Sequence, residues 1–204
     1  MIIRINPDNP QQRLVRQVAE CLRKGGIIAY PTDTIYGVGC SIFNKKGLKR
    51  IYQLKQRDQR KPFSFICSNL AQIATYAHVS NMAFKVMKRH LPGPYTFVLP
   101  ATRNVPDLVV ARQRTVGVRI PDNNIVLALV EELGEPLVTT SANVAGDATY
   151  QDPEVIQDDW GKQLDIVVDG GMISGEPSTV ISLCDDNIEV LRHGCGDTEW
   201  IHQL

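Results

Sequence analysis

Two polar stretches of this chain carry the residue types that bind phosphate groups. The first is a cationic run that precedes the apolar segment Phe63 to Cys67, and it contains Lys55, Arg57, Arg60 and Lys61. The second lies far along the chain, at residues 139–143 with the sequence TTSAN. Ammonium, guanidinium, hydroxyl and amide donors can together stabilise charge on a phosphate without a covalent step. These residues predict an anion site if the fold brings the two stretches together.

The cationic run also fits a simpler explanation, a charged helix end. Lys and Arg are favoured in the last turn of a helix, where they complement the carbonyl end of its dipole. A helical face does precede the cations, made by Leu48, Ile51, Tyr52 and Leu54. The phosphate site requires a second polar cluster at the same place, and Ser141 with Asn143 is the candidate.

A third polar segment, residues 32–39 with the sequence TDTIYGVG, follows the apolar stretch Ile27 to Tyr30. A glycine-bearing polar loop after a buried strand is where α/β folds place ligand groups. A plain turn has the same composition. Tyr36 stands among small polar residues, which favours an exposed ring that packs on a substrate.

Arg119 lies inside the otherwise apolar strand candidate Val116 to Ile120. An arginine in such a place usually snorkels or pairs rather than staying buried alone. Two alternatives follow: a structural ion pair, or binding of an anion or carboxylate.

The apolar patterns predict helices that alternate with short strands. Helices are expected from Asn9–Pro10 to Gly25, around residues 48–54, after Ser80, after Asp122 as far as Gly134, and after Asp152–Pro153. Strands are expected at residues 27–30, 63–67, 95–99, 116–120, 136–140 and 165–169. Residues 178–183 and 187–191 predict a closing hairpin, and residues 105–114 are ambiguous.

This alternation predicts an α+β fold of α/β-like character. We expect residues 1–204 to form a single three-layer domain with a twisted, mixed parallel and antiparallel sheet. Ser141 and the loop after Tyr30 would then both lie at the carboxyl ends of strands.

Bulk composition excludes several classes of protein. The chain has 204 residues, no net charge and 43% hydrophobic residues, which is typical of a folded globular protein. Zero net charge argues against a protein whose whole surface grips nucleic acid, but it allows a local basic groove. No apolar run approaches the roughly 20 residues that cross a bilayer. We expect a cytoplasmic protein without membrane contact.

The five cysteines are scattered and lack any CxxC spacing. They predict reduced thiols in or near the core, and no metal site. The motifs of phosphate loops, dinucleotide folds, serine hydrolases and zinc proteases are also missing from the sequence. A nucleotide enzyme would therefore need another phosphate site.

The chain resembles the YrdC-like family of threonylcarbamoyl-AMP synthases, with a YrdC/RibB-like fold. The resemblance extends over residues 25–196 and rests, in chain order, on YPTDTIYGVG, KQRDQRKPFSF, LPGPYTFVLP, VGVRIP, TTSANVAG, STVI and VLRHGCG. Its most specific part is K-x-R followed by S-x-N, which falls on Lys55, Arg57, Ser141 and Asn143. The opening NPDNPQQRL and the length look more like the YciO branch.

The resemblance implies a nucleotidyltransferase reaction. L-threonine, bicarbonate and ATP would give threonylcarbamoyl-AMP and pyrophosphate, with Mg²⁺ bound mainly through the phosphates. Downstream tRNA-modification proteins would use the product on an adenosine next to the anticodon.

The resemblance also implies roles for individual residues. Phosphates would be contacted by Lys55, Arg57, Ser141 and Asn143, with Lys61 and Arg192 as further nucleotide contacts. Threonine would be bound by Thr32, Thr34, Tyr36 and Arg119. The chain departs from the family pattern at Asp58, Phe63 and Ser182, and Asp58 adds a negative charge beside the expected phosphate site.

Two other functions fit the same residues. One is a module of the YciO type that binds double-stranded RNA or tRNA through the same cations, with weak or no synthase activity. The other is a structural or regulatory protein with a vestigial nucleotide pocket. Binding to RNA should weaken steeply with salt, whereas a compact ATP pocket should depend less on ionic strength.

Overall fold

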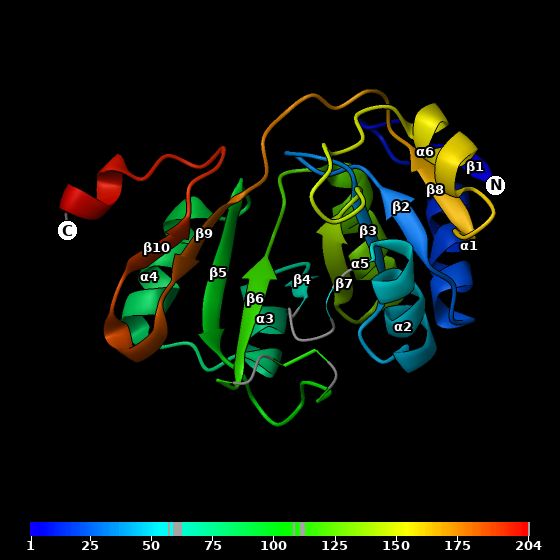
Figure 1. Ribbon diagram of the computed structural model, residues 1–204. Helices are drawn as coiled ribbons and strands as arrows, with labels where there is room; N and C mark the ends of the chain where they lie inside the picture. The colour runs from blue at the N-terminus through cyan, green and yellow to red at the C-terminus, as the bar shows by residue number, and fades with distance from the viewer. Residues whose placement is uncertain (57, 59–62, 108, 111–112, 204) are drawn as a thin grey trace.

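A mixed sheet of ten strands forms the middle layer of the structure (Figure 1). This computed structural model describes residues 1–56, 58, 63–107, 109–110 and 113–203. The strand order is β1-β8-β2-β3-β7-β4-β6-β5-β9-β10. The strands are β1 Ile2–Arg4, β2 Ile28–Tyr30, β3 Gly37–Ser41, β4 Ser64–Ile66, β5 Tyr95–Pro100, β6 Thr115–Arg119, β7 Leu137–Ser141, β8 Ile166–Asp169, β9 Thr179–Ser182 and β10 Glu189–Arg192.

Helices cover both faces of this sheet. They are α1 Gln12–Arg23, α2 Lys45–Leu54, α3 Leu70–Tyr76, α4 Asn81–His90, α5 Asn124–Leu133 and α6 Pro153–Trp160, with short 3₁₀ turns at Cys184–Asp186 and Glu199–Gln203. The apolar faces of α1 and α5 share one core cluster. Those of α2, α3, α4 and α6 share the other. Successive strand residues such as Leu137 and Val138 belong to opposite clusters, so the three-layer prediction is confirmed.

The pairing of β4 brings together the segments that matter for function. β4 runs antiparallel to β7 and parallel to β6. β7 is also antiparallel to β3, whose first residue, Gly37, lies opposite Ser141. Residues from widely separated parts of the chain therefore share the middle of the sheet.

Most predicted helix boundaries agree with the structure, and two do not. The Ser80 side chain accepts from the Ala83 amide, and Gly134 ends α5 in the left-handed conformation at φ 80°. The first helix begins at Gln12 rather than Pro10, because the Asn6 side chain accepts from the amides of residues 8 and 9 and holds them in a turn. Asn123, not Asp122, caps α5.

Some elements were not expected. β1 and α3 had no prediction, and residues 37–39, expected as loop, begin β3. Glycine is needed there for close approach: a Cβ at Gly39 would lie 2.0 Å from the Val138 carbonyl oxygen, and one at Gly37 3.0 Å from the Tyr30 ring. The described part of residues 105–114 contains no helix or strand.

The cysteines are unpaired thiols with different exposure. Cys40 and Cys67 are buried, and burial raises the pKa of each to about 12. Cys195 is exposed, so the prediction of a core or near-core position is wrong for it. In the part of the chain that the structure describes, no helix has the length and apolarity to span a membrane.

Candidate functional site

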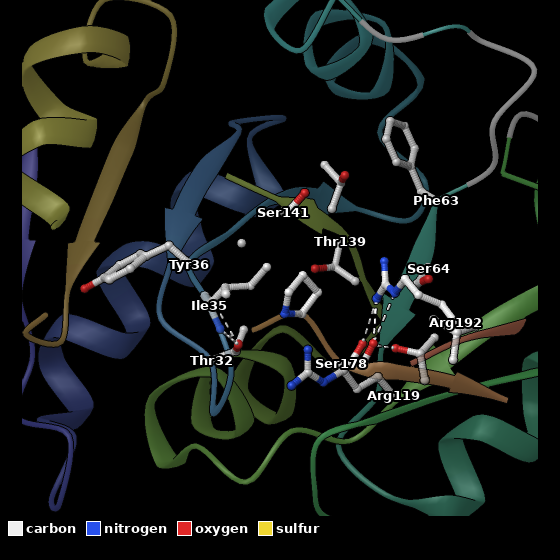
Figure 2. Close-up of a pocket in the computed structure, with 15 residues that line it drawn as sticks. Thr32, Ile35, Tyr36, Phe63, Ser64, Arg119, Thr139, Ser141, Ser178 and Arg192 are labelled. Atoms are coloured by element: carbon white, nitrogen blue, oxygen red, sulfur yellow. Dashed lines mark hydrogen bonds between the residues drawn. The ribbon is translucent and has the colours of Figure 1, made fainter. Parts of the chain in front are cut away.

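A cavity of about 170 Å³ lies over the middle of the sheet (Figure 2). Its floor comes from the neighbouring strands β7, β4, β6, β5 and β9. Its walls come from the loop before β3, from Pro177 and Ser178 before β9, and from Arg192 on β10. Sites for drug-sized ligands enclose roughly 300–1,000 Å³, so this cavity can enclose a small ligand or one end of a larger one.

Hydroxyl groups and cations dominate the lining of the cavity. The side chains that carry hydroxyls are Thr32, Ser64, Thr96, Thr139, Thr140, Ser141 and Ser178, apart from Tyr36. Two guanidinium groups, Arg119 and Arg192, also line it, and the described lining residues include no carboxylate. Such a lining suits a ligand with anionic and hydrogen-bonding groups.

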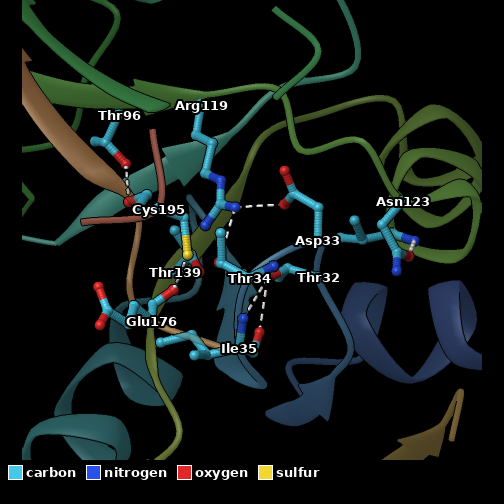
Figure 3. A network of polar contacts seen from close by, with 12 residues as sticks. Thr32, Asp33, Thr34, Ile35, Thr96, Arg119, Asn123, Thr139, Glu176 and Cys195 are labelled. Carbon is cyan, nitrogen blue, oxygen red and sulfur yellow. Dashed lines mark hydrogen bonds and ion pairs between the residues drawn. The ribbon is translucent and has the colours of Figure 1, made fainter. Parts of the chain in front are cut away.

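Arg119 forms a buried ion pair with Asp33, the structural alternative of the two that its place in an apolar strand allows (Figure 3). Its Nη2 donates to the Asp33 carboxylate and, at 2.9 Å, to the Thr34 hydroxyl. The two paired side chains are only 8% and 11% exposed. Burial lowers the pKa of the Arg119 guanidinium, and the Asp33 charge opposes that shift. Arg119 is therefore both structurally paired and part of the cavity lining.

Thr32 and Thr34 hold the loop that carries Asp33. The Thr32 hydroxyl donates to the Ile35 carbonyl at 2.6 Å and accepts from the amides of Thr34 and Ile35. Thr32 lines the cavity, whereas Thr34 is connected to it through hydrogen bonds to Arg119 and Thr32. The expected threonine-binding role of both residues stays a prediction.

Tyr36 does not present an exposed ring. Its side chain is buried in the apolar core and points away from the cavity (Figure 2). Its hydroxyl donates to the Gly171 carbonyl at 2.7 Å and accepts from the Gly170 amide. The predicted exposure was wrong because the ring packs in the core beneath β3. Burial accordingly raises the pKa of Tyr36.

Lys55, Ser141 and Asn143 do meet. Lys55 follows the last residue of α2, is 1% exposed, and donates to the Ser141 carbonyl, to the Asn143 carbonyl at 2.7 Å and to Asn143 Oδ1 at 2.9 Å. The Ser141 hydroxyl donates to the same Oδ1 at 2.6 Å. A solvated helix end is therefore the wrong description of Lys55. Ser141 lines the cavity, with Lys55 and Asn143 behind it.

The other expected phosphate contacts have mixed outcomes. Arg57 and Lys61 lie outside the described residues. Arg192 lines the cavity, where its Nη2 donates to the Ser178 carbonyl at 2.7 Å. No group of three or more His, Cys, Asp or Glu side chains that could hold a metal occurs among the residues that the structure describes.

Several lining residues were missed in the sequence. Ser64 and Thr96 are single polar residues within the apolar runs FSFIC and YTFVL, and that interruption was a readable signal. Asp33 was readable too, because a buried arginine needs a carboxylate and Asp33 belongs to the polar loop. The Thr96 hydroxyl hydrogen-bonds to that of Ser178 at 2.8 Å, which joins β5 to the segment before β9.

Comparison with known sequences identifies relatives over almost the whole chain. The model of the Sua5/YciO/YrdC family, described as "Telomere recombination", matches residues 20–194. The uncharacterized protein YciO of Escherichia coli (strain K12) is 45% identical over 197 residues, covering 96% of each chain. A putative threonylcarbamoyl-AMP synthase of Methanocaldococcus jannaschii is 35% identical over 200 residues, covering 95% of this chain and 92% of the relative.

Solved structures give the same picture. The crystal structure of E. coli YciO has a TM-score of 0.93 at 43% identity and covers 98% of both chains. P. abyssi Sua5 complexed with L-threonine also has a TM-score of 0.93, at 30% identity, and this chain spans 60% of that protein. From the family match and these relatives, the chain belongs to the Sua5/YciO/YrdC family.

Proposed function

We propose that the protein makes threonylcarbamoyl-AMP and pyrophosphate from L-threonine, bicarbonate and ATP. One observation carries the proposal: a single cavity is lined by the buried Arg119 and by Ser141, behind which lies the Lys55 ammonium. Relatives named threonylcarbamoyl-AMP synthase and the threonine complex of Sua5 support it. The product would serve downstream tRNA-modification proteins in the cytoplasm.

The proposed reaction has two steps. The threonine amine takes up bicarbonate to form a carbamate and water. A carbamate oxygen then attacks the α-phosphorus of ATP, and the bond to the β-phosphate oxygen breaks to release pyrophosphate. Positioning and charge stabilisation supply most of the catalysis of such a transfer.

The chain's residues take complementary roles in this proposal. Arg119 pairs with the threonine carboxylate, while Thr32 and Thr34 hold the loop beside it. Ser141 faces the phosphates, and Asn143 and Lys55 lie behind it, where Lys55 adds positive charge. Arg57, Lys61 and Arg192 are the further phosphate contacts.

Mg²⁺ fits this chain only as part of the substrate. The described lining residues include no carboxylate, and the nearby Asp33 is engaged with Arg119. Magnesium prefers carboxylate and phosphate oxygens. We therefore expect the ion to be bound mainly through the phosphates of ATP, with no site of its own among the residues that the structure describes.

Incubation of the purified chain with ATP, labelled bicarbonate and L-threonine tests the proposal. The expected result is labelled threonylcarbamoyl-AMP, with pyrophosphate released only when threonine is present. Absence of product at every ratio of enzyme to substrate would overturn it.

A second candidate function, RNA binding, is favoured by the surface of α2. Lys45, Lys46 and Lys49 are exposed, α2 has no acidic residue, and none of the three has an ion pair within the described residues. If RNA binds through these lysines, the logarithm of the binding constant should fall linearly with the logarithm of the salt concentration. Each lost phosphate contact should reduce the steepness of that line by about 0.9. Lys45→Glu with Lys49→Glu should flatten the plot for a tRNA, and an unchanged slope would reject this surface. A protein with neither synthase activity nor RNA binding would fit the third alternative, a structural or regulatory protein with a vestigial nucleotide pocket.

A further inference from the structure

The seven serine and threonine side chains that line the cavity fall into two groups, according to whether their hydroxyls already form hydrogen bonds within the protein. Five are already engaged within the protein: Thr32 with Ile35, Thr96 with Ser178, Thr139 with Tyr30, and Ser141 with Asn143. Within the described part of the chain, the hydroxyls of Ser64 and Thr140 have no hydrogen-bond partner. An unengaged hydroxyl offers its O–H donor and both of its acceptor lone pairs to a ligand, whereas an engaged hydroxyl offers only what its bond within the protein leaves over.

Strand register places Ser64 on the floor of the cavity. Ser64 lies opposite Thr139 on β7 and beside Gly117 on β6. Paired residues project to the same face of a sheet. Thr140, the next residue of β7, projects to the other face. Ser64 is therefore the unengaged hydroxyl on the face that also carries Thr139.

The absence of a side chain at Gly117 makes room for the Ser64 hydroxyl on this face of the sheet. A Cβ at Gly117 would lie 2.6 Å from Ser64 Oγ and 3.2 Å from Thr96 Cγ2. Arg119 is two residues further along β6 and so projects to the same face. A small ligand held by the Arg119 guanidinium on this face would therefore have the Ser64 hydroxyl, which fills the space over Gly117, beside its remaining polar groups. Figure 2 shows Ser64 and both guanidinium groups around the same space.

We propose that Ser64 is a substrate-binding residue, whose hydroxyl contacts the amino acid that Arg119 holds by its carboxylate. This inference rests on the proposed function for the identity of the ligand. It adds a contact from β4 that neither the K-x-R and S-x-N residues nor the polar loop supplies. The ligand class is a small α-amino acid with a polar group within reach of the cavity floor.

Titration calorimetry of L-threonine into the purified chain tests this contact. We expect Ser64→Ala to weaken binding at least fivefold. Ser182→Ala is the matched control, because Ser182 is a strand serine outside the cavity lining, and it should stay within twofold of the unsubstituted chain. Gly117→Ala keeps the hydroxyl but crowds it, and should also weaken binding.

The choice of amino acid locates the contact. L-valine has the shape of threonine without its hydroxyl. If Ser64→Ala weakens the binding of threonine but not of valine, Ser64 contacts the side-chain hydroxyl of threonine. If it weakens the binding of both equally, Ser64 contacts the main-chain groups of the amino acid. Unchanged binding in Ser64→Ala overturns the inference while leaving the proposed function intact. An unsubstituted chain that binds no amino acid overturns both.

Discussion

Two buried cations flank the site, and the contacts described for them differ. Arg119 is paired with the carboxylate of Asp33. The contacts described for Lys55 are to neutral oxygens: two carbonyls, an amide and, at 3.5 Å, a hydroxyl. A carboxylate partner neutralises a buried charge, whereas neutral dipoles solvate it.

The difference suggests separate tasks for the two ends of the site. Removing the carboxylate beside Arg119 leaves an uncompensated charge in the protein interior, so stability should suffer most. Removing Lys55 takes positive charge from behind Ser141, so the reaction should suffer most. Variants at each end can therefore test whether stability and catalysis depend on different cations.

The largest expected effect is on stability, from Asp33→Asn. Breaking a buried ion pair by removing one partner costs about 3 kcal/mol or more, and this pair is nearly inaccessible. Urea unfolding of the full chain measures the loss. Glu20→Gln is the control, because Glu20 pairs with Arg23 on the surface of α1 and exposed pairs contribute about 0–1 kcal/mol. Equal losses in both variants would contradict the difference between buried and exposed pairs.

Lys55→Ala should lower the rate of threonylcarbamoyl-AMP formation well over tenfold. That factor corresponds to about 1.4 kcal/mol or more of transition-state stabilisation. Asn143→Ala should behave similarly, because its side-chain oxygen is shared by Lys55 and Ser141. Initial rates with saturating threonine measure the effect, and Lys24→Ala, at the exposed residue that follows α1, is the control. Near-normal rates in both site variants would remove the phosphate role from this cluster.

Tyr36→Phe should cost about 1 kcal/mol of stability and leave the KM for threonine unchanged. The hydroxyl holds residues 170 and 171, and the ring faces the core rather than the cavity. Tyr76→Phe is the control, because its hydroxyl has no hydrogen bond among the described residues. A raised KM in Tyr36→Phe alone would show that the hydroxyl also serves the substrate.

The smallest effect concerns pH and a histidine outside both clusters. Burial and the neighbouring Arg89 lower the pKa of His90, which stacks on Trp200 with ring centroids 4.1 Å apart. The unfolded chain then binds the proton more readily, so this contribution to stability is present above pH about 6.5 and is lost as the pH falls. Urea unfolding at pH 7.5 and 5.5 should show a smaller decrease for His90→Gln than for the unsubstituted chain. Equal decreases would contradict the shift.

The sequence predicted the Lys55 cluster better than the Arg119 pair for a physical reason. Ser141 is the last residue of β7, Asn143 follows that strand, and Lys55 follows an amphipathic helix, so local patterns already placed them at element ends. Asp33 and Ser64 depend on which strands become neighbours. The position of β4 between β7 and β6 is set by long-range pairing, which no local pattern records.

Tyr36 shows a second limit of local patterns. It is the residue immediately before β3, where a shift of one position reverses the face to which a side chain projects. The polar neighbours of Tyr36 indicated exposure, but the ring lies in the core. Helix caps were easier to predict, because Ser80 and Asp152 each bind an amide two or three residues away.

The pairing of β1 with β8 affects how the chain must fold. β1 is hydrogen-bonded along Ile2–Arg4 to residues 167–169, and β8 also separates it from β2. During synthesis, the first strand therefore has no partner until most of the polypeptide has left the ribosome. Such contacts between distant segments slow folding, because the entropy of closing a long loop is lost before the pairing stabilises it. The cavity floor combines strands from residues 64 to 182, so ligand binding should emerge only late in refolding.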